Sequence, residues 1–291
     1  MNTLQQLQLQ RDGAVATVRL NRPEVRNAFH ADTISELTEV FAALSQDDSL
    51  RAVVLASSGT AFCAGADLNW MRRMADYNRQ QNIDDAGELA RMLRTIFECP
   101  KPTVARVQGD VYAGGMGLVA ACDMAVSLDS AGYCLSEVKL GLIPATISPY
   151  VIHAIGERAA RRYFVTAERF SAERAQVLGL VHEVVAPEAL RATVDGIVEQ
   201  VLRNGPLAVK AIHRILDEAA AHWPSTRLGL HHRIGRLELG EVSIVIVGAS
   251  PHRGDASNRA PTPDGAMRPP TRLGLRDQST ARRFHQSSTP P

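Results

Sequence analysis

The sequence has few cysteines, few aromatic residues and almost no net charge. Four cysteines occur in 291 residues, and no two of them form a CxxC pair. The sequence therefore predicts neither a zinc site nor a disulfide framework, and we expect no bound metal. Lysine and arginine number 32 against 31 aspartates and glutamates. This balance argues against a nucleic-acid partner, because proteins that bind nucleic acid usually have a strong basic excess.

Long apolar runs and nucleotide-binding loops are also missing. No stretch approaches the ~18 consecutive apolar residues of a transmembrane helix, and residues 1–10 lack the basic and apolar segments of a signal peptide. We therefore expect a cytoplasmic protein that makes no membrane contact. No GxxxxGK motif is present, and GDVYAGG at 109–115 does not have the GxGxxG spacing of dinucleotide-binding folds.

Strand and helix patterns alternate along the chain. Apolar alternation over Leu7–Leu20, centred on Asp12-Gly13, predicts a β-hairpin. Apolar residues at helical spacing predict helices over 31–44 and 84–98 and a short buried helix over 118–121. Short apolar runs predict buried strands at 53–55, 103–107, 124–126 and 181–185. The alternation favours the α/β class.

The chain changes character toward its C-terminus. We expect a core over residues 1–195, in which Ser171 caps a helix, and the start of a helical region over 196–221, where Pro206 fits a first helical turn. Residues 222–250 form a divergent segment. Residues 251–291 contain seven prolines and seven arginines, a composition that predicts a disordered tail.

Two glycine-containing stretches could bind an oxygen atom through their backbone. Phe62–Asp67 and Gly109–Gly117 each follow a predicted buried strand, and their small residues leave backbone N–H groups open to a ligand. Gly114 lies where a helix begins, so its N–H has no partner within that helix. Two such groups directed at one oxygen would form an oxyanion hole. The alternative is that these glycines only permit tight packing of strand on helix.

Glu137 is the candidate for general acid–base chemistry. It lies in SEVKLGLIP at 136–144 among apolar residues, and burial there would raise the pKa of its carboxyl group. The alternative is an exposed glutamate paired with Lys139. His153 and His182 are more consistent with hydrogen-bonded structural histidines than with ligands.

Four motifs in order resemble those of the enoyl-CoA hydratase/isomerase family, the crotonase superfamily. They are NRPEVRNA at 21–28, FCAGADL at 62–68, AGGMGLVAACD at 113–123 and SEVKLGLIP at 136–144. The resemblance covers about residues 5–220. Within it, the segments at 134–151 and 156–170 are similar to bacterial methylglutaconyl-CoA hydratases.

The resemblance implies a fold, a substrate and a site. The expected fold is a crotonase-like α/β spiral of ββα units with a mostly helical C-terminal part, assembled into homotrimers or hexamers. The thioester oxygen of an acyl-CoA would accept hydrogen bonds from the backbone amides of Ala66 and Gly114, and Glu137 would be the catalytic carboxylate. No cofactor is implied, because CoA is part of the substrate. The implied substrate-binding residues are Ala64, Ala66, Asp67, Leu68, Asn69 and Gly114.

The implied reaction is hydration of a 2-enoyl-CoA to a 3-hydroxyacyl-CoA by a carbon–oxygen lyase. The expected enzyme is the methylglutaconyl-CoA hydratase of leucine degradation. Gly117 stands where typical hydratases carry a first glutamate, so only Glu137 remains. A single carboxylate is equally the pattern of Δ3,Δ2-enoyl-CoA isomerases, which is the alternative.

Three other departures from the family leave questions open. Asn69 occupies a position that is often lysine, so contacts with the CoA phosphates would differ. The second carboxylate of a methylglutaconyl chain needs a cation, for which Arg72, Arg73 and His153 are candidates. After Ala221 the motifs end abruptly, and an inactive crotonase-like binding protein is therefore a third hypothesis.

Overall fold

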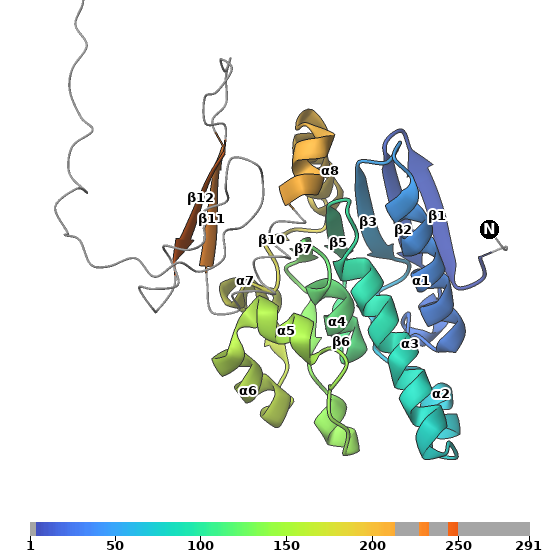
Figure 1. The fold of residues 1–291 in the computed structure, drawn as a ribbon. Helices are drawn as coiled ribbons and strands as arrows, with labels where there is room; N and C mark the ends of the chain where they lie inside the picture. The colour runs from blue at the N-terminus through green and yellow to red at the C-terminus, as the bar shows by residue number, and fades with distance from the viewer. Residues whose placement is uncertain (1–3, 213–226, 233–243, 250–291) are drawn as a thin grey trace, which may run out of the picture. The chain divides into compact units, whose positions relative to one another are not determined.

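The computed structural model describes residues 4–212, 227–232 and 244–249 (Figure 1). The chain divides into two compact units, Met1–His213 and Arg214–Pro291. Within the second unit, the described residues form an antiparallel pair of strands, β11 (Arg227–His232) and β12 (Ile244–Ala249). The helix expected from Pro206 is described as far as residue 212. The tail expected over 251–291 lies outside the described residues.

A six-stranded sheet has the order β1-β2-β3-β5-β7-β10. The predicted hairpin is confirmed, since β1 and β2 pair antiparallel and Gly13 has the positive φ of 54° that a tight turn needs. The other pairs are parallel. The strands are β1 Leu7–Asp12, β2 Val15–Leu20, β3 Ala52–Ser57, β5 Thr103–Val107, β7 Met124–Leu128 and β10 Glu183–Val185.

The last of these strands is shorter than the predicted 181–185. His182 precedes β10 and makes two hydrogen bonds with the backbone of Ala125. Its own backbone N–H donates to the Ala125 carbonyl at 2.8 Å, and its Nδ1 accepts from the Ala125 N–H at 3.1 Å. The ring therefore takes the place of a backbone acceptor. His182 is a structural histidine, as expected.

A second sheet was not predicted. Its order is β4-β6-β8-β9, with β4 (Ala61–Cys63), β6 (Asp110–Tyr112) and β8 (Gly132–Cys134) parallel and β9 (Phe170–Ser171) antiparallel to β8. The stretches 62–67 and 109–113, expected to be loops, thus contain strands. Strands of three residues are too short to show a period of two in the sequence.

The two sheets are built together from ββα units. In three successive units the first strand joins the larger sheet and the second joins the smaller one: β3 with β4, β5 with β6, and β7 with β8. Helices follow each pair in the chain. The expected α/β fold is confirmed, and its two-sheet form places the ends of the short strands beside one another.

The predicted helices are present: the one over 31–44 begins at Ala31 as expected, and two others begin earlier than residues 84 and 118. The helix expected at 84 begins at Arg79, because Asn78 and Gln81 form a capping box there. The helical pattern at 118–121 belongs to a helix that begins at Gly114, where a helix start was expected. Ser171 caps α7 as predicted. The helices are α1 Ala31–Gln46, α2 Leu68–Met74, α3 Arg79–Phe97, α4 Gly114–Ala120, α5 Ser148–Ile155, α6 Glu157–Thr166, α7 Ala172–Leu178 and α8 Leu190–Arg203, with short 3₁₀ helices η1 Pro23–Val25 and η2 Glu137–Leu140.

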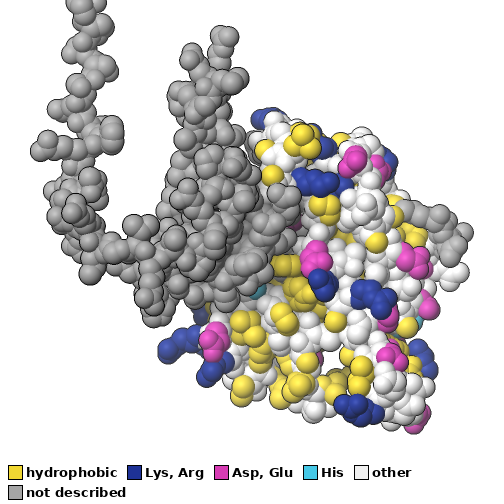
Figure 2. All heavy atoms as spheres, in the orientation of Figure 1, with side chains coloured by type: hydrophobic (Ala, Val, Ile, Leu, Met, Phe, Trp, Pro, Cys, Tyr) yellow, Lys and Arg dark blue, Asp and Glu magenta, His cyan; other side chains and the backbone are white. Residues whose placement is uncertain are grey.

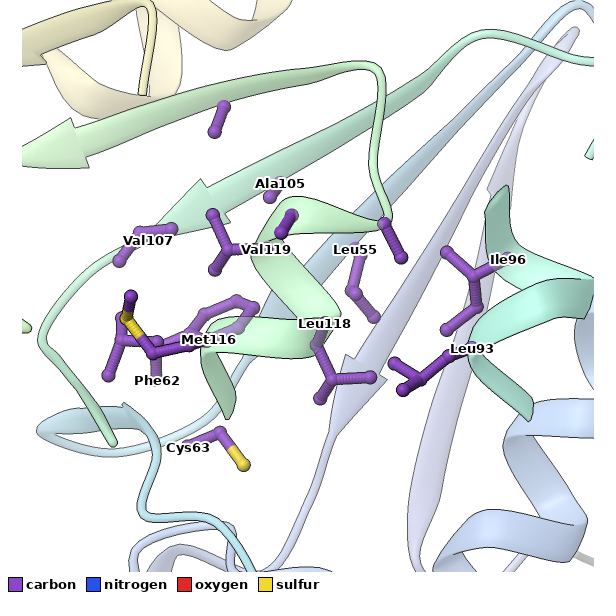
Figure 3. Close-up of a cluster of buried hydrophobic side chains, with 14 of the residues drawn as sticks. Leu55, Phe62, Cys63, Leu93, Ile96, Ala105, Val107, Met116, Leu118 and Val119 are labelled. Carbon is purple, nitrogen blue, oxygen red and sulfur yellow. The ribbon is translucent and has the colours of Figure 1, made fainter. Parts of the chain in front are cut away.

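Helix α4 is buried at the centre of the main core. Figure 3 shows Met116, Leu118 and Val119 of α4 lying among side chains of β3, β4, β5 and α3. Helices α1 and α3 pack on each other, and α8 covers a separate apolar cluster on β3, β5 and β7. Because α4 is enclosed, its first residues have a fixed position. Within the described ranges, no helix combines the length and the apolar content that crossing a membrane requires.

Candidate active site

The three candidate segments meet at one edge of the smaller sheet. Strands β4, β6 and β8 are parallel neighbours, so their carboxyl ends lie at the same edge. Residues 64–67 follow β4, residues 113–115 follow β6, and residues 135–137 follow β8. The Ala113 amide donates to the Cys134 carbonyl at 2.9 Å and continues the pairing of β6 with β8 beyond the strands.

The first loop, residues 64–67, is paired with the backbone of Phe29. The Phe29 amide donates to the Gly65 carbonyl at 2.8 Å, and the Asp67 amide donates to the Phe29 carbonyl at 2.9 Å. This parallel bridge uses the carbonyl of Gly65 and the amide of Asp67, which lie on either side of Ala66. The Ala66 N–H has no acceptor among the described residues, and Ala66 is partly exposed.

The Asp67 carboxylate is fully engaged within the protein. It caps α2 by accepting from the amides of Asn69 at 2.8 Å and Trp70 at 3.3 Å, and it pairs with Arg22 at 3.0 Å. Burial would raise the pKa of Asp67, but the two amides and the Arg22 cation together lower it below its usual value. Asp67 therefore shapes the first loop. The side chains of Leu68 and Asn69 beside it are exposed, and their contact with a substrate stays a prediction.

The residues of the NRPEVRNA motif support this loop. Asn27 is buried with a positive φ of 55°, and its Nδ2 donates to the carbonyls of Ser58 and Ala61 at 2.7 and 2.9 Å. Arg22 donates to the Ala28 carbonyl as well as to Asp67. The structural roles of Asn27 and Arg22 could not be predicted from residue type, although both residues lie in the NRPEVRNA motif.

The second loop, residues 113–115, presses against the first. A Cβ atom on Gly115 would lie 2.6 Å from the Cys63 carbonyl oxygen, and one on Gly65 would lie 3.3 Å from the Gly114 nitrogen. Ala113 has φ 47° and ψ −122°, which is a strained conformation for a residue with a side chain. The glycines therefore do permit tight packing, and the same packing brings the two loops together.

Phe29 contacts both loops. Its backbone pairs beside Ala66, and its ring lies so close to Gly114 that an added Cβ would be 2.3 Å from Phe29 Cζ. Gly114 is the first residue of α4, and its N–H also has no acceptor within the described part of the chain. Two free, partly exposed amides thus belong to adjoining loops.

Glu137 begins η2, directly after the third strand end. Its Oε2 atom is buried and has no hydrogen-bond partner among the described residues. Burial raises the pKa of its carboxyl group above the usual value. No ion pair with Lys139 is formed in the part of the chain that the structure describes. A carboxylate oxygen in this state is free to exchange a proton with a bound molecule.

Position 117, where a second catalytic glutamate would stand, leaves no space for a side chain. Gly117 lies in buried α4, and a Cβ atom there would be 2.4 Å from Cγ2 of Ile147. A glutamate side chain has no room at this point. Arg72, Arg73 and His153 have exposed side chains, and the pairing of any of them with a substrate carboxylate stays a prediction.

Comparison with known proteins places these features in a family. Residues 10–233 match the family model for enoyl-CoA hydratase/isomerase, which extends past residue 221, where the sequence motifs end. The short-chain-enoyl-CoA hydratase of Clostridium acetobutylicum is 31% identical over 204 residues, 69% of this chain and 77% of that protein. The trans-2-decenoyl-[acyl-carrier-protein] isomerase of Streptococcus mutans is 28% identical over 73% of this chain and 82% of its own length.

A solved structure agrees with the sequence match. The crystal structure of an enoyl-CoA hydratase from Shewanella pealeana superposes with a TM-score of 0.73 at 40% sequence identity. The superposition covers 76% of this chain and 82% of that one.

Replacing Gly115 with alanine should loosen the contact between the two loops. The added methyl group would lie 2.6 Å from the Cys63 carbonyl oxygen, which belongs to rigid backbone. We expect the free energy of unfolding to fall by about 1–3 kcal/mol in urea denaturation, as for other overpacked sites. Gly87→Ala is the control: its Cβ would meet nothing within 4 Å on helix α3, so it should stabilise the protein by up to about 1 kcal/mol. Equal urea midpoints for G115A and the parent would contradict the tight contact.

Proposed function

The chain belongs to the enoyl-CoA hydratase/isomerase family, and on this premise we propose that it hydrates a 2-enoyl-CoA thioester to a 3-hydroxyacyl-CoA. The observation that carries the proposal is the buried, unpartnered Glu137 oxygen at the sheet edge where the loops with two free amides meet. The segments at 134–151 and 156–170 favour methylglutaconyl-CoA, an intermediate of leucine degradation, as the substrate.

The two free amides would stabilise the charge that develops during the reaction. When an oxygen nucleophile adds to C3 of the enoyl group, electron density moves through C2 to the thioester oxygen. Hydrogen bonds from the Ala66 and Gly114 amides to that oxygen would lower the energy of the enolate. Donors of this kind can each contribute about 10²–10³ in rate. Both amides are fixed before the substrate arrives, because Phe29 and buried α4 hold the loops.

Glu137 would move the proton. As its carboxylate takes a proton from water, the water oxygen forms its bond to C3. The protonated Glu137 then delivers that proton to C2 of the enolate, and the carboxylate is regenerated. One carboxylate is sufficient, since water supplies both the hydroxyl group and the new hydrogen. We propose no cofactor or metal for this sequence of steps.

Arg26 is a candidate contact for the CoA phosphates that sequence reasoning missed. Its carbonyl accepts from the Ala64 amide at 3.0 Å, so it lies beside the first loop. Its side chain is exposed and has no ion pair or hydrogen bond among the described residues. This arginine could take the place of the lysine that many relatives have where this chain has Asn69. The other residues proposed to line the CoA chain are Ala64, Leu68 and Asn69, with Asp67 contributing through the loop that it holds in place.

Isomerisation is the second candidate function. A single carboxylate can remove a proton from C2 of a 3-enoyl thioester and return it to C4. Because position 117 has no space for a second acid, Glu137 is the one candidate acid in the part of the site that the structure describes, and this fits isomerisation as well as hydration. One relative described above is named an isomerase.

We also propose that the chain assembles into homotrimers or hexamers, as the family resemblance implies. Four apolar side chains after Glu137 are exposed, including Ile143 at 81%, and a second copy could cover them: Val138, Leu140, Leu142 and Ile143. Figure 2 shows apolar side chains gathered on the viewed face over α5 and α6.

Glu137→Gln should lower kcat for hydration of crotonyl-CoA and methylglutaconyl-CoA by about 10²–10⁴, because the amide cannot carry the proton. The measurement is the loss of absorbance of the conjugated enoyl thioester, with urea denaturation to show that the variant is folded. Glu188→Gln, an exposed glutamate far along the chain, is the matched control and should keep the parent rate. A variant E137Q with near-parent kcat would refute the role of Glu137.

Parallel incubations of a 2-enoyl-CoA and a 3-enoyl-CoA in ¹⁸O-labelled water separate the candidate functions. Hydration places one labelled oxygen in the product, whereas isomerisation of a 3-enoyl-CoA gives a conjugated product without label. Isomerisation alone would overturn the hydratase proposal and retain Glu137. A folded parent that converts neither substrate would favour the inactive, binding-protein hypothesis.

The pH dependence of kcat/KM should report the buried carboxyl group. Burial raises the pKa of Glu137 above its usual 4.5. Below that raised pKa the group is protonated and cannot take a proton from water, so activity should fall as the pH falls, with a midpoint above 4.5. The residual activity of E137Q should lack this acid limb. A midpoint at or below 4.5 would show that another group controls the reaction.

Arg26→Gln should raise KM for the CoA thioester by about two- to fivefold with little change in kcat, because an exposed ion pair contributes about 0.2–1 kcal/mol. The N-acetylcysteamine thioester of the same acyl group lacks phosphates and should show no difference between parent and variant. Arg161→Gln, which removes an exposed arginine on α6, is the control. An equal KM change with both thioesters would mean that Arg26 acts on loop structure rather than on phosphate.

A further inference from the structure

We infer that the face of the larger sheet next to α8 carries a second binding site, formed by Arg19 and Arg106, for a phosphate-type anion. This site shares no residue with the candidate active site and does not depend on the proposed function.

The strand register places the two arginines in one row across the sheet. Arg19 of β2 is paired with Ala56 of β3, and the pairing of Leu55 with Ala105 puts Ala56 beside Arg106 of β5. The arginines therefore flank Ala56 at two strand spacings, about 10 Å between Cα atoms. An alanine side chain is short, so both arginine side chains can extend over it toward a common point.

Both arginines lie on the face that α8 covers. The neighbours of Arg106 in β5, Ala105 and Val107, point into the main core, so Arg106 lies on the opposite face of the sheet. It shares that face with Val104, which packs in the apolar cluster beneath α8. Arg19 likewise alternates with residues of the main core and shares its face with Val15. The two side chains are thus held on the same side of the sheet, at the edge of an apolar cluster.

Neither arginine has a partner within the described residues. Both are half-buried, yet no hydrogen bond or ion pair involves either side chain there. The charged groups of α8 that act on Arg106 are Arg191 and Asp195, which pair with each other at 3.5 Å. Burial, followed by the charge of Arg19, lowers the pKa of Arg106. Three cations and one acid leave an uncompensated positive charge.

An arrangement of this kind is costly unless an anion occupies it. Two guanidinium groups that repel each other and are half removed from water destabilise the fold, and aliphatic residues would suit this row better. Residues that destabilise the fold locally, as these two arginines do, are characteristic of binding sites. A phosphate group fits the chemistry, because its several oxygens can accept from two guanidinium forks at once and its charge offsets both cations.

The test is calorimetric titration of the full chain with inorganic phosphate, at constant ionic strength set by chloride. The parent should bind phosphate saturably, and Arg106→Gln should weaken binding at least tenfold. Arg161→Gln removes an exposed arginine of α6 and should bind like the parent. Arg19→Gln gives an independent variant with the same expected loss, should R106Q fail to fold.

A second measurement uses stability in the absence of phosphate. There R106Q should unfold at a higher urea concentration than the parent, because it removes an unpaired, half-buried charge, and phosphate should raise the midpoint of the parent alone. Absence of saturable binding by the parent, or equal binding by parent and both variants, would overturn the site. So would a change in oligomeric state of R106Q without phosphate binding by the parent, since Arg106 would then contact another copy of the chain.

Discussion

The backbone bridge between Phe29 and the first loop is the constraint on which the site depends. Its two hydrogen bonds, to the Gly65 carbonyl and from the Asp67 amide, leave the Ala66 amide between them without a partner. The Phe29 ring also sets the distance to Gly114, where a side chain has no space. A single residue outside both loops therefore leaves the Ala66 amide free and contacts Gly114, whose own amide is free because Gly114 begins α4.

Much of the larger sheet could be predicted from the sequence, because its strands are long enough to show their pattern. The hairpin at Asp12-Gly13 and the buried strands near Val53, Thr103 and Met124 are confirmed. The smaller sheet could not be predicted, since its strands have two or three residues and carry no period. That sheet brings the candidate segments to one edge, so their convergence followed from the family resemblance and not from local pattern.

Residue type alone also did not distinguish an acid with a structural role from an acid that is available for catalysis. Asp67 and Glu137 are both acids in glycine-containing segments, but Asp67 is saturated by two amides and Arg22, whereas an oxygen of Glu137 has no partner in the described structure. Their pKa values accordingly move in opposite directions. Two of the partners that lower the pKa of Asp67, the amides of Asn69 and Trp70, are local in the chain, but Arg22 is 45 residues away, a relation that composition and spacing do not record.

The contact between Gly117 and Ile147 restricts the order in which substitutions can accumulate. A larger residue at 117 collides with the Ile147 side chain, so a second acid can be introduced only after position 147 has become smaller. That first step alone opens a cavity in a buried region and costs about 2–5 kcal/mol. The two positions are thus epistatic: we expect each substitution to destabilise the fold in the background that lacks the other, so that neither is neutral as a first step.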